Sequence, residues 1–232
     1  MTKFVAFSDT HGKHENLSMP KGDVLLFAGD ANMETVSKTI TFLKWIKNLP
    51  YKIKIIVAGN HDKIPYEDYS YFKELCKELN ITYVKDEFLD EQSEGAFYLE
   101  DAGFTIKRPD RLFKVYGSPW SPTFLNWSFL KPEMKLKDIW QKIPVDTDIL
   151  ITHSPPKLIN DTNKKDKHLG STFLLQRVKF EMMINKPELH VFGHIHPNTE
   201  KNRKRFTGDT FLNVGVLDEQ NKLKFQPTII TL

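Results

Sequence analysis

The sequence is poor in cysteine, in long apolar runs and in net charge, and each shortage excludes a class of protein. Cys76 is the single cysteine among 232 residues, so an intrachain disulfide and a cysteine-rich zinc site are both excluded. A reducing compartment suits this composition, and we expect a cytoplasmic protein. Strand-like sequence begins at Lys3 with no apolar signal core, which argues against secretion. No window approaches about 18 uninterrupted apolar residues, so we expect no membrane-spanning segment and no membrane partner.

The formal net charge is only +3, and 40% hydrophobic with 27% charged residues is an ordinary globular composition. A mildly basic chain tolerates an anionic substrate but gives no reason to expect nucleic acid as a partner. The sequence contains no internal repeat, low-complexity tract or clear linker, so we predict a single domain over residues 1–232. The oligomeric state stays open.

Five apolar runs predict buried strands. They are Phe4–Phe7, Asp23–Ala28, Ile53–Ala58, Asp148–Thr152 and Leu189–Phe192. The runs are continuous rather than alternating, which indicates strands covered on both faces. Helical spacing of apolar residues predicts helices over 33–50, 66–79 and 171–185, and the early strand–helix–strand order indicates a parallel sheet.

Two stretches indicate antiparallel pairing instead. Residues 96–115 carry AFYLE, FTIK and LFKVYG around a turn at 101–103, which predicts hairpins. The C-terminal residues 210–232 predict short strands around an Asp-Glu-Gln-Asn turn. We therefore predict an α/β fold in which two packed mixed sheets are flanked by helices.

Polar side chains follow each of the five apolar runs. In chain order they are Asp9 and His11, then Asp30, then Asn60, His61 and Asp62, then His153, and last His194 and His196. One such residue after a strand is ordinary turn chemistry. Five occurrences at the carboxyl ends of strands indicate a ligand site, because that edge of an α/β sheet is where ligands bind.

The residue types in this set favour metal ions. Apart from His61 and Asp62, the set holds two Asp, one Asn and four His with no thiolate, which suit Mn, Fe, Zn, Co or Ni. Seven ligands are too many for one tetrahedral ion with an open position, and they suit two ions that share a carboxylate. Glycines stand before Asp30, Asn60 and His194, where they allow the backbone to approach a crowded centre.

Taken in order, these motifs resemble those of the calcineurin-like metallophosphoesterases. The resemblance rests on DTH at 9–11, GD at 29–30, GNHD at 59–62, His153 and GHIH at 193–196. A narrower resemblance is to the class III cyclic-nucleotide phosphodiesterase-like branch. It rests on SDTHGKH, GSPWSP, ITHSPP and HLGSTFLL. The resemblance implies a four-layer α/β/β/α sandwich that hydrolyses phosphate esters, phosphodiesters and cyclic nucleotides being favoured.

The resemblance also implies a role for each side chain. One ion would be held by Asp9, His11, Asp30 and His196, and the second by Asp30, Asn60, His153 and His194. His61 would be the catalytic histidine that is not a ligand, with Asn60 beside it on the substrate and Asp62 orienting its ring. The sequence departs from the family pattern at Ser154, at Ser171 and over PNTEKNRKR at 197–205. None of these positions is a predicted ligand, so the departures bear on substrate preference and not on the chemistry.

Two ions about 3.5–4 Å apart would clamp the attacking and leaving oxygens of an in-line displacement at phosphorus. A bridging hydroxide would attack, and His61 would protonate the leaving oxygen. Two alternatives stay open: a phosphomonoesterase or protein-phosphatase-like hydrolase, and a non-catalytic interaction scaffold with the same fold.

Four further features have two interpretations each. The aromatic stretch 118–129 is either a wall for a nucleobase or a packed lip over the core. The basic residues 201–205 either steer anions or form a solvated hairpin tip. His14 either touches substrate phosphate or sits in a surface loop. Residues 161–167 predict a loop that borders the substrate entrance.

Overall fold

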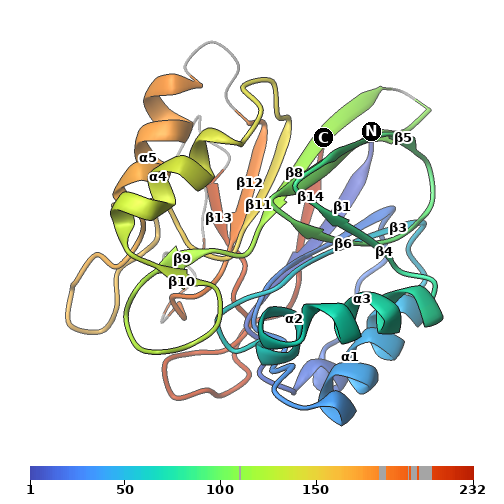
Figure 1. Ribbon diagram of the computed structural model, residues 1–232, viewed down its shortest axis with the longest axis horizontal. Coiled ribbons are helices and arrows are strands. Elements are labelled where there is room, and N and C mark those ends of the chain that lie inside the picture. The colour runs from blue at the N-terminus through green and yellow to red at the C-terminus, as the bar shows by residue number, and fades with distance from the viewer. Residues whose placement is uncertain (110, 183–186, 198, 200–202, 204–210) are drawn as a thin grey trace.

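The chain folds into two six-stranded sheets that face each other, as the computed structural model in Figure 1 shows. It describes residues 1–232 apart from 110, 183–186, 198, 200–202 and 204–210. The first sheet has the order β14 (Thr228–Thr231), β1 (Lys3–Phe7), β2 (Val24–Ala28), β3 (Ile53–Val57), β6 (Gly95–Glu100) and β4 (Thr82–Lys85). All neighbours in it are parallel except β14, which is antiparallel to β1.

The second sheet contains most of the later strands. Its order is β13 (Phe211–Asn213), β12 (Leu189–Phe192), β11 (Ile149–Thr152), β8 (Leu112–Ser118), β7 (Ala102–Lys107) and β5 (Phe88–Gln92). Only β7 and β8 pair antiparallel. A short parallel pair, β9 (Ser121–Pro122) and β10 (Leu130–Lys131), stands apart. Both sheets are mixed, as predicted.

Helices cover the outer face of each sheet, which confirms the predicted sandwich. Against the first sheet lie α1 (Val36–Asn48), α2 (Lys63–Glu67) and α3 (Tyr69–Glu78); against the second lie α4 (Glu133–Gln141) and α5 (Thr172–Gln176). A π-helical turn over Arg177–Glu181 extends α5. In the part of the chain that the structure describes, no helix has the length and apolar character needed to cross a membrane.

The continuous apolar strands are explained by two separate cores. Along β2, Val24 and Leu26 point into the core between the sheets. Leu25 and Phe27 point outward into the core beneath the helices. All four side chains are fully buried, so neither face of the strand tolerates a polar residue.

One predicted hairpin is wrong. Strands β6 and β7, separated by Asp101 alone, lie in different sheets, so the chain crosses from one sheet to the other at that residue. Asp101 has φ 50° and accepts hydrogen bonds from Ser118 Oγ (2.6 Å) and Trp120 Nε1 (2.8 Å). Two apolar strands joined by a short turn have the same sequence pattern whether they pair in one sheet or cross between two sheets. Here the hydrogen bonds of Asp101 to Ser118 and Trp120 hold the turn in the crossing conformation. The hairpin of β7 and β8 is confirmed.

The helices differ from their predictions mainly at their ends. Of the apolar stripe predicted for α1, Leu43 and Ile46 are buried, whereas Val36 is 42% exposed. Phe42, which was not in that stripe, is buried beside them. The segment predicted as one helix over 66–79 is broken at Asp68, whose carboxylate accepts from Tyr71 N (3.3 Å) and caps α3. The helix predicted over 171–185 is shorter, and its residues 183–185 lie outside the described part of the chain.

The elements α4, β4, β5, β9 and β10 were not predicted. Strand β5 is largely exposed, so it lacks the apolar pattern by which strands are recognised. The ends of the chain lie side by side, since Thr2 N donates to Leu232 O (2.8 Å) and Leu232 N to Thr2 O (3.1 Å).

Candidate metal centre

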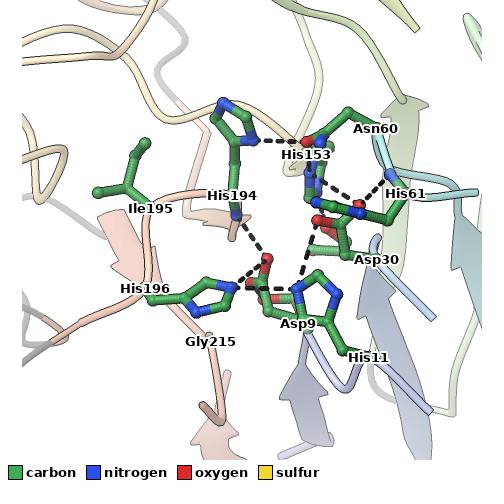
Figure 2. Close-up of polar contacts among 12 residues, drawn as sticks. Asp9, His11, Asp30, Asn60, His61, His153, His194, Ile195, His196 and Gly215 are labelled. Carbon is green, nitrogen blue, oxygen red and sulfur yellow. Dashed lines mark hydrogen bonds and ion pairs between the residues drawn. The ribbon is translucent and has the colours of Figure 1, made fainter. Parts of the chain in front are cut away.

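The structure brings all seven predicted ligands together at one rim of the sandwich. They follow β1, β2 and β3 in one sheet and β11 and β12 in the other, and Figure 2 shows their side chains converging from both sides. Three overlapping groups place ligand atoms within 4.8 Å of one another: Asp9, His11 and His196; Asp9, Asp30 and His153; and His11, Asp30 and His61. The parallel order of the strands produces this convergence, because it puts their carboxyl ends at one edge.

Asp30 stands at the middle of the cluster, and its side chain is 3% exposed. Its Oδ1 accepts from His61 N (2.8 Å) and lies 3.3 Å from His153 Nε2, while its Oδ2 lies 3.7 Å from His11 Nε2. Burial by itself would raise the pKa of Asp30. Together, the positive charge and hydrogen bond of His153 and the charge of His11 outweigh burial and hold the pKa of Asp30 well below its usual range. The carboxylate is therefore ionised and faces both halves of the cluster.

The first group surrounds a point between Asp9, His11 and His196. The Nε2 atoms of the two imidazoles are 3.1 Å apart, and His196 Nε2 lies 3.8 Å from Asp9 Oδ1. Asp9 is fixed in turn by Ser8 Oγ (2.5 Å) and His194 N (2.9 Å). Two ring nitrogens and the carboxylate of Asp9, with Asp30 Oδ2 3.7 Å from His11 Nε2, suit a divalent transition metal.

The ligands predicted for the second ion surround the side-chain oxygen of Asn60. Asn60 Oδ1 lies 3.0 Å from His153 Nε2 and 2.7 Å from His194 Nδ1. His153 is fully buried, and Asp30 Oδ1 completes the group at 3.3 Å from its Nε2. One neutral amide, two imidazoles and one carboxylate fit a second ion, with Asp30 common to both groups.

Backbone carbonyls orient two of these imidazoles. His153 Nδ1 is 2.8 Å from Ala28 O, and His196 Nδ1 is 3.0 Å from Asp218 O. When Nδ1 donates to a carbonyl, Nε2 presents its lone pair toward the centre, an arrangement common for metal-ligating histidines. Neither carbonyl was predicted, since a backbone oxygen has no sequence signature. The donor set and its orientation therefore fit two metal ions.

The local backbone is adapted to this crowding. Asp9 (φ 53°), His11 (41°), Asp30 (62°) and His194 (67°) all adopt the left-handed conformation, which costs free energy for non-glycine residues. A Cβ atom at Gly59 would collide with the carboxylate of Asp30, and one at Gly193 with that of Asp9. The predicted reason for these two glycines, close approach of the backbone to the centre, agrees with this geometry.

The structure corrects the predicted role of Asp62. Its Oδ2 accepts from Gly59 N (2.8 Å), Asp30 N (3.0 Å) and Ala31 N (3.4 Å), and its Oδ1 from Met33 N (3.0 Å). Among the hydrogen bonds of the described residues, none joins this carboxylate to the ring of the neighbouring histidine. Burial and the charge of Asp30 raise the pKa of Asp62 to about 7. Asp62 clamps two loops beneath the centre instead of orienting a catalytic ring.

The ring of His61 lies at the edge of the cluster. Its centroid is 4.7 Å from that of His11 and 4.5 Å from that of Trp127. Because His61 belongs to one of the three metal-capable groups, geometry alone does not separate it from the ligands. Its role as a catalytic residue remains a prediction.

His14 fits neither of its two interpretations. It is buried, and its ring packs against Phe42 (5.3 Å between centroids) and Trp45 (4.8 Å) beneath α1. Ser171, a departure from the family pattern, caps α5 through Leu174 N (3.1 Å) and accepts from Trp140 Nε1 (2.9 Å). That departure therefore concerns helix packing, since Ser171 does not line the cavity described next.

A cavity of about 530 Å³ opens above the metal-ligating residues. Its lining includes Thr123, Phe124 and Trp127 and, from later segments of the chain, Asn163, Lys164, Leu169, Glu219 and Asn221. The loop predicted at 161–167 thus borders the entrance. The basic residues 201–205 lie outside the described part of the chain except for Arg203, which is buried and donates to Gln226 O (3.0 Å).

The chain belongs to the calcineurin-like phosphoesterase family, which its sequence matches over residues 2–198. Metallophosphoesterase domain-containing protein 1 of Homo sapiens is 38% identical over 207 residues, covering 84% of this chain and 60% of that protein. The chain therefore spans about three fifths of that relative. A UPF0046 protein of Caenorhabditis elegans is 33% identical over 240 residues, covering 99% of this chain and 80% of the relative. A solved crystal structure shares the fold with a TM-score of 0.60 at 15% identity, covering 99% and 98% of the two chains.

Metal affinity should rise with pH. Burial lowers the pKa of His153, but the carboxylate of Asp30 outweighs burial and raises it to about 9. Below that pH the metal-free ring holds a proton that an incoming ion must displace. Burial lowers the pKa of His194 to about 3, so its ring holds no proton that an ion must displace in this pH range. Apparent Mn²⁺ affinity, measured by calorimetry between pH 6.5 and 8.5, should increase about tenfold per pH unit. The variant His168→Gln is the control and should keep this slope; a pH-independent affinity would contradict the assignment.

The clamp role of Asp62 predicts a large loss of stability. Asp62→Ala leaves four buried amides without their acceptor, so the free energy of unfolding should fall by about 3 kcal/mol or more. Asp62→Asn retains one carbonyl oxygen in the same place and should lose about half as much. Urea denaturation of the metal-free protein measures both values. Equal stability of Asp62→Ala and the unaltered protein would refute the clamp.

Proposed function

We propose that the chain is a phosphodiesterase that uses two divalent transition-metal ions, with cyclic nucleotides as the leading substrate class. The observation that carries the proposal is the position of Asp30 between the ring nitrogens of His11 and His153, each of which lies beside further predicted ligands. When bound, the ions would activate water and neutralise charge on the phosphoryl oxygens. We also propose that this function operates in the cytoplasm and on small substrates rather than nucleic acid.

The residues of the chain supply orientation and a proton. Asn60 and His61 line the cavity and are placed to contact the phosphate. As an oxygen of water forms a bond to phosphorus, the bond from phosphorus to the leaving oxygen breaks. His61 donates its proton to that leaving oxygen, which departs as an alcohol.

A second cavity supports a diester as substrate. It has a volume of about 390 Å³ and shares Asn60, His61, Thr123 and Trp127 with the larger one. The two cavities thus adjoin each other and are both lined by His61 and Trp127. An acyclic diester carries two separate organic groups, and two adjoining cavities give each of them room, whereas a cyclic nucleotide carries a single nucleoside and needs one. A monoester needs only one.

The scaffold alternative is less well supported. A non-catalytic member of such a fold has no need of its ligands, yet each predicted ligand position holds a residue that binds metals. The backbone strain and the orienting carbonyls described above would also have no purpose. Such costs persist where a functional site requires them.

Hydrolysis of model substrates tests the proposal. Bis-p-nitrophenyl phosphate should be hydrolysed with a kcat/KM at least about tenfold above that of p-nitrophenyl phosphate, because each organic group contributes contacts. Chelation should abolish turnover and Mn²⁺ should restore it. Asp30→Asn, which keeps the shape of the side chain but loses its charge, should bind less metal and show no turnover. Preference for the monoester would overturn the diester assignment, and no turnover of either would favour the scaffold.

The role of His61 has its own test. His61→Ala should retain both ions but lower kcat by roughly 10²–10⁴, the usual contribution of a general acid. Metal content measured by mass spectrometry separates the two roles that the geometry leaves open. Loss of an ion in His61→Ala would show that His61 is a ligand. His168→Gln, a histidine outside the cavity lining, serves as the matched control.

A further inference from the structure

The aromatic loop, residues 120–129 between β8 and α4, is divided into inward and outward side chains. Trp120 and Phe129 point inward: Phe129 is 1% exposed, and its ring lies 5.5 Å from Trp120 and 5.0 Å from Tyr66. Phe124 and Trp127 point outward and are 64% and 40% exposed. The inward pair therefore forms the packed lip over the core, and the outward pair is left to serve as the wall for a nucleobase.

Backbone hydrogen bonds hold the aromatic loop at both of its ends and attach it to the segment that carries Asn60. Ser121 N donates to Phe129 O (2.9 Å), and Thr123 N donates to Lys131 O (3.0 Å). Ser128 N donates to Asn60 O (3.2 Å), which ties the loop to a proposed ligand. The exposed rings are thus held in a fixed place relative to the ions.

Phe124 and Trp127 together line the larger cavity. Their ring centroids are 6.0 Å apart, and the ring of Trp127 also contacts His61. Lys164, Glu219 and Asn221 line the same cavity, and their side chains offer hydrogen-bond donors and acceptors. A largely apolar lining with a few polar groups is typical of small-molecule sites, and the volume of about 530 Å³ lies within their usual range.

We propose that this cavity binds the nucleobase of a nucleotide ester, stacked on Trp127 and Phe124, with its polar edge toward Lys164, Glu219 and Asn221. The inference rests on the proposed function, since it places the phosphate at the metal centre. Two large exposed rings beside a charged centre favour a substrate with its own planar π-face. The Leu125 side of the aromatic loop belongs to the smaller cavity, where Lys63 and Glu67 form an ion pair (3.3 Å). The smaller cavity is therefore suited to a polar group.

Binding of two phosphates that differ by a base tests the inference without requiring turnover. Adenosine 5′-monophosphate and ribose 5-phosphate are titrated calorimetrically into the Mn²⁺-loaded protein. The nucleotide should bind about tenfold or more tightly, because stacking of one base on an aromatic side chain is worth that factor. Trp127→Leu should remove most of this advantage and leave ribose 5-phosphate binding unchanged, and Phe124→Leu should remove part of it.

Phe180→Leu is the matched control, because it replaces an exposed aromatic ring (65% exposed) that lines neither cavity. Its preference for the nucleotide should equal that of the unaltered protein. Equal affinity of the two phosphates, or a preference that survives Trp127→Leu, would overturn the base subsite while leaving the proposed function intact. Failure of both phosphates and of inorganic phosphate to bind would overturn the proposed function, and the subsite with it.

Discussion

The carboxylate of Asp30 is the group on which the arrangement of the rim depends. It is buried, charged and in contact with residues from both sheets: His11 and His61 from one, His153 from the other. An isolated buried charge would be very costly, so its partners must be in place for the fold to be stable. The two sheets are consequently held in one relative position at this rim. Beneath it, Asp62 fastens the two loops that carry Asp30 and Asn60.

Much of this rim could be predicted from the sequence, for a physical reason. Strands buried on both faces read as continuous apolar runs, so a polar residue after such a run marks the end of a strand. Parallel strands bring those ends to one edge, which places Asp9 and Asp30 near Asn60 although up to 51 positions separate them. Residue type then indicated metal ions. The fold class, with its two packed sheets, followed from the strand and hairpin patterns, and the family resemblance added the four-layer order.

The remainder depended on contacts that have no local pattern. The crossover at Asp101 is decided by Ser118 and Trp120, which follow it by 17 and 19 positions. Asp62 looked like a partner for the adjacent imidazole, but its neighbours in space are backbone amides from another loop. His14 follows a polar turn, yet the packing of α1 buries it. In each case tertiary packing overrode what adjacent residues suggested.

The antiparallel pairing of β14 with β1 has a consequence for the chain as a whole. Both ends of the polypeptide emerge at the amino end of β1, whereas the metal-ligating residues follow its carboxyl end. A partner fused to either terminus would therefore be attached on the side away from the cavity. Thr2 and Leu232 are also close enough to be joined by a short linker. A short peptide joining them would permit new ends to be opened at an exposed turn elsewhere, a rearrangement that proteins with neighbouring termini tolerate.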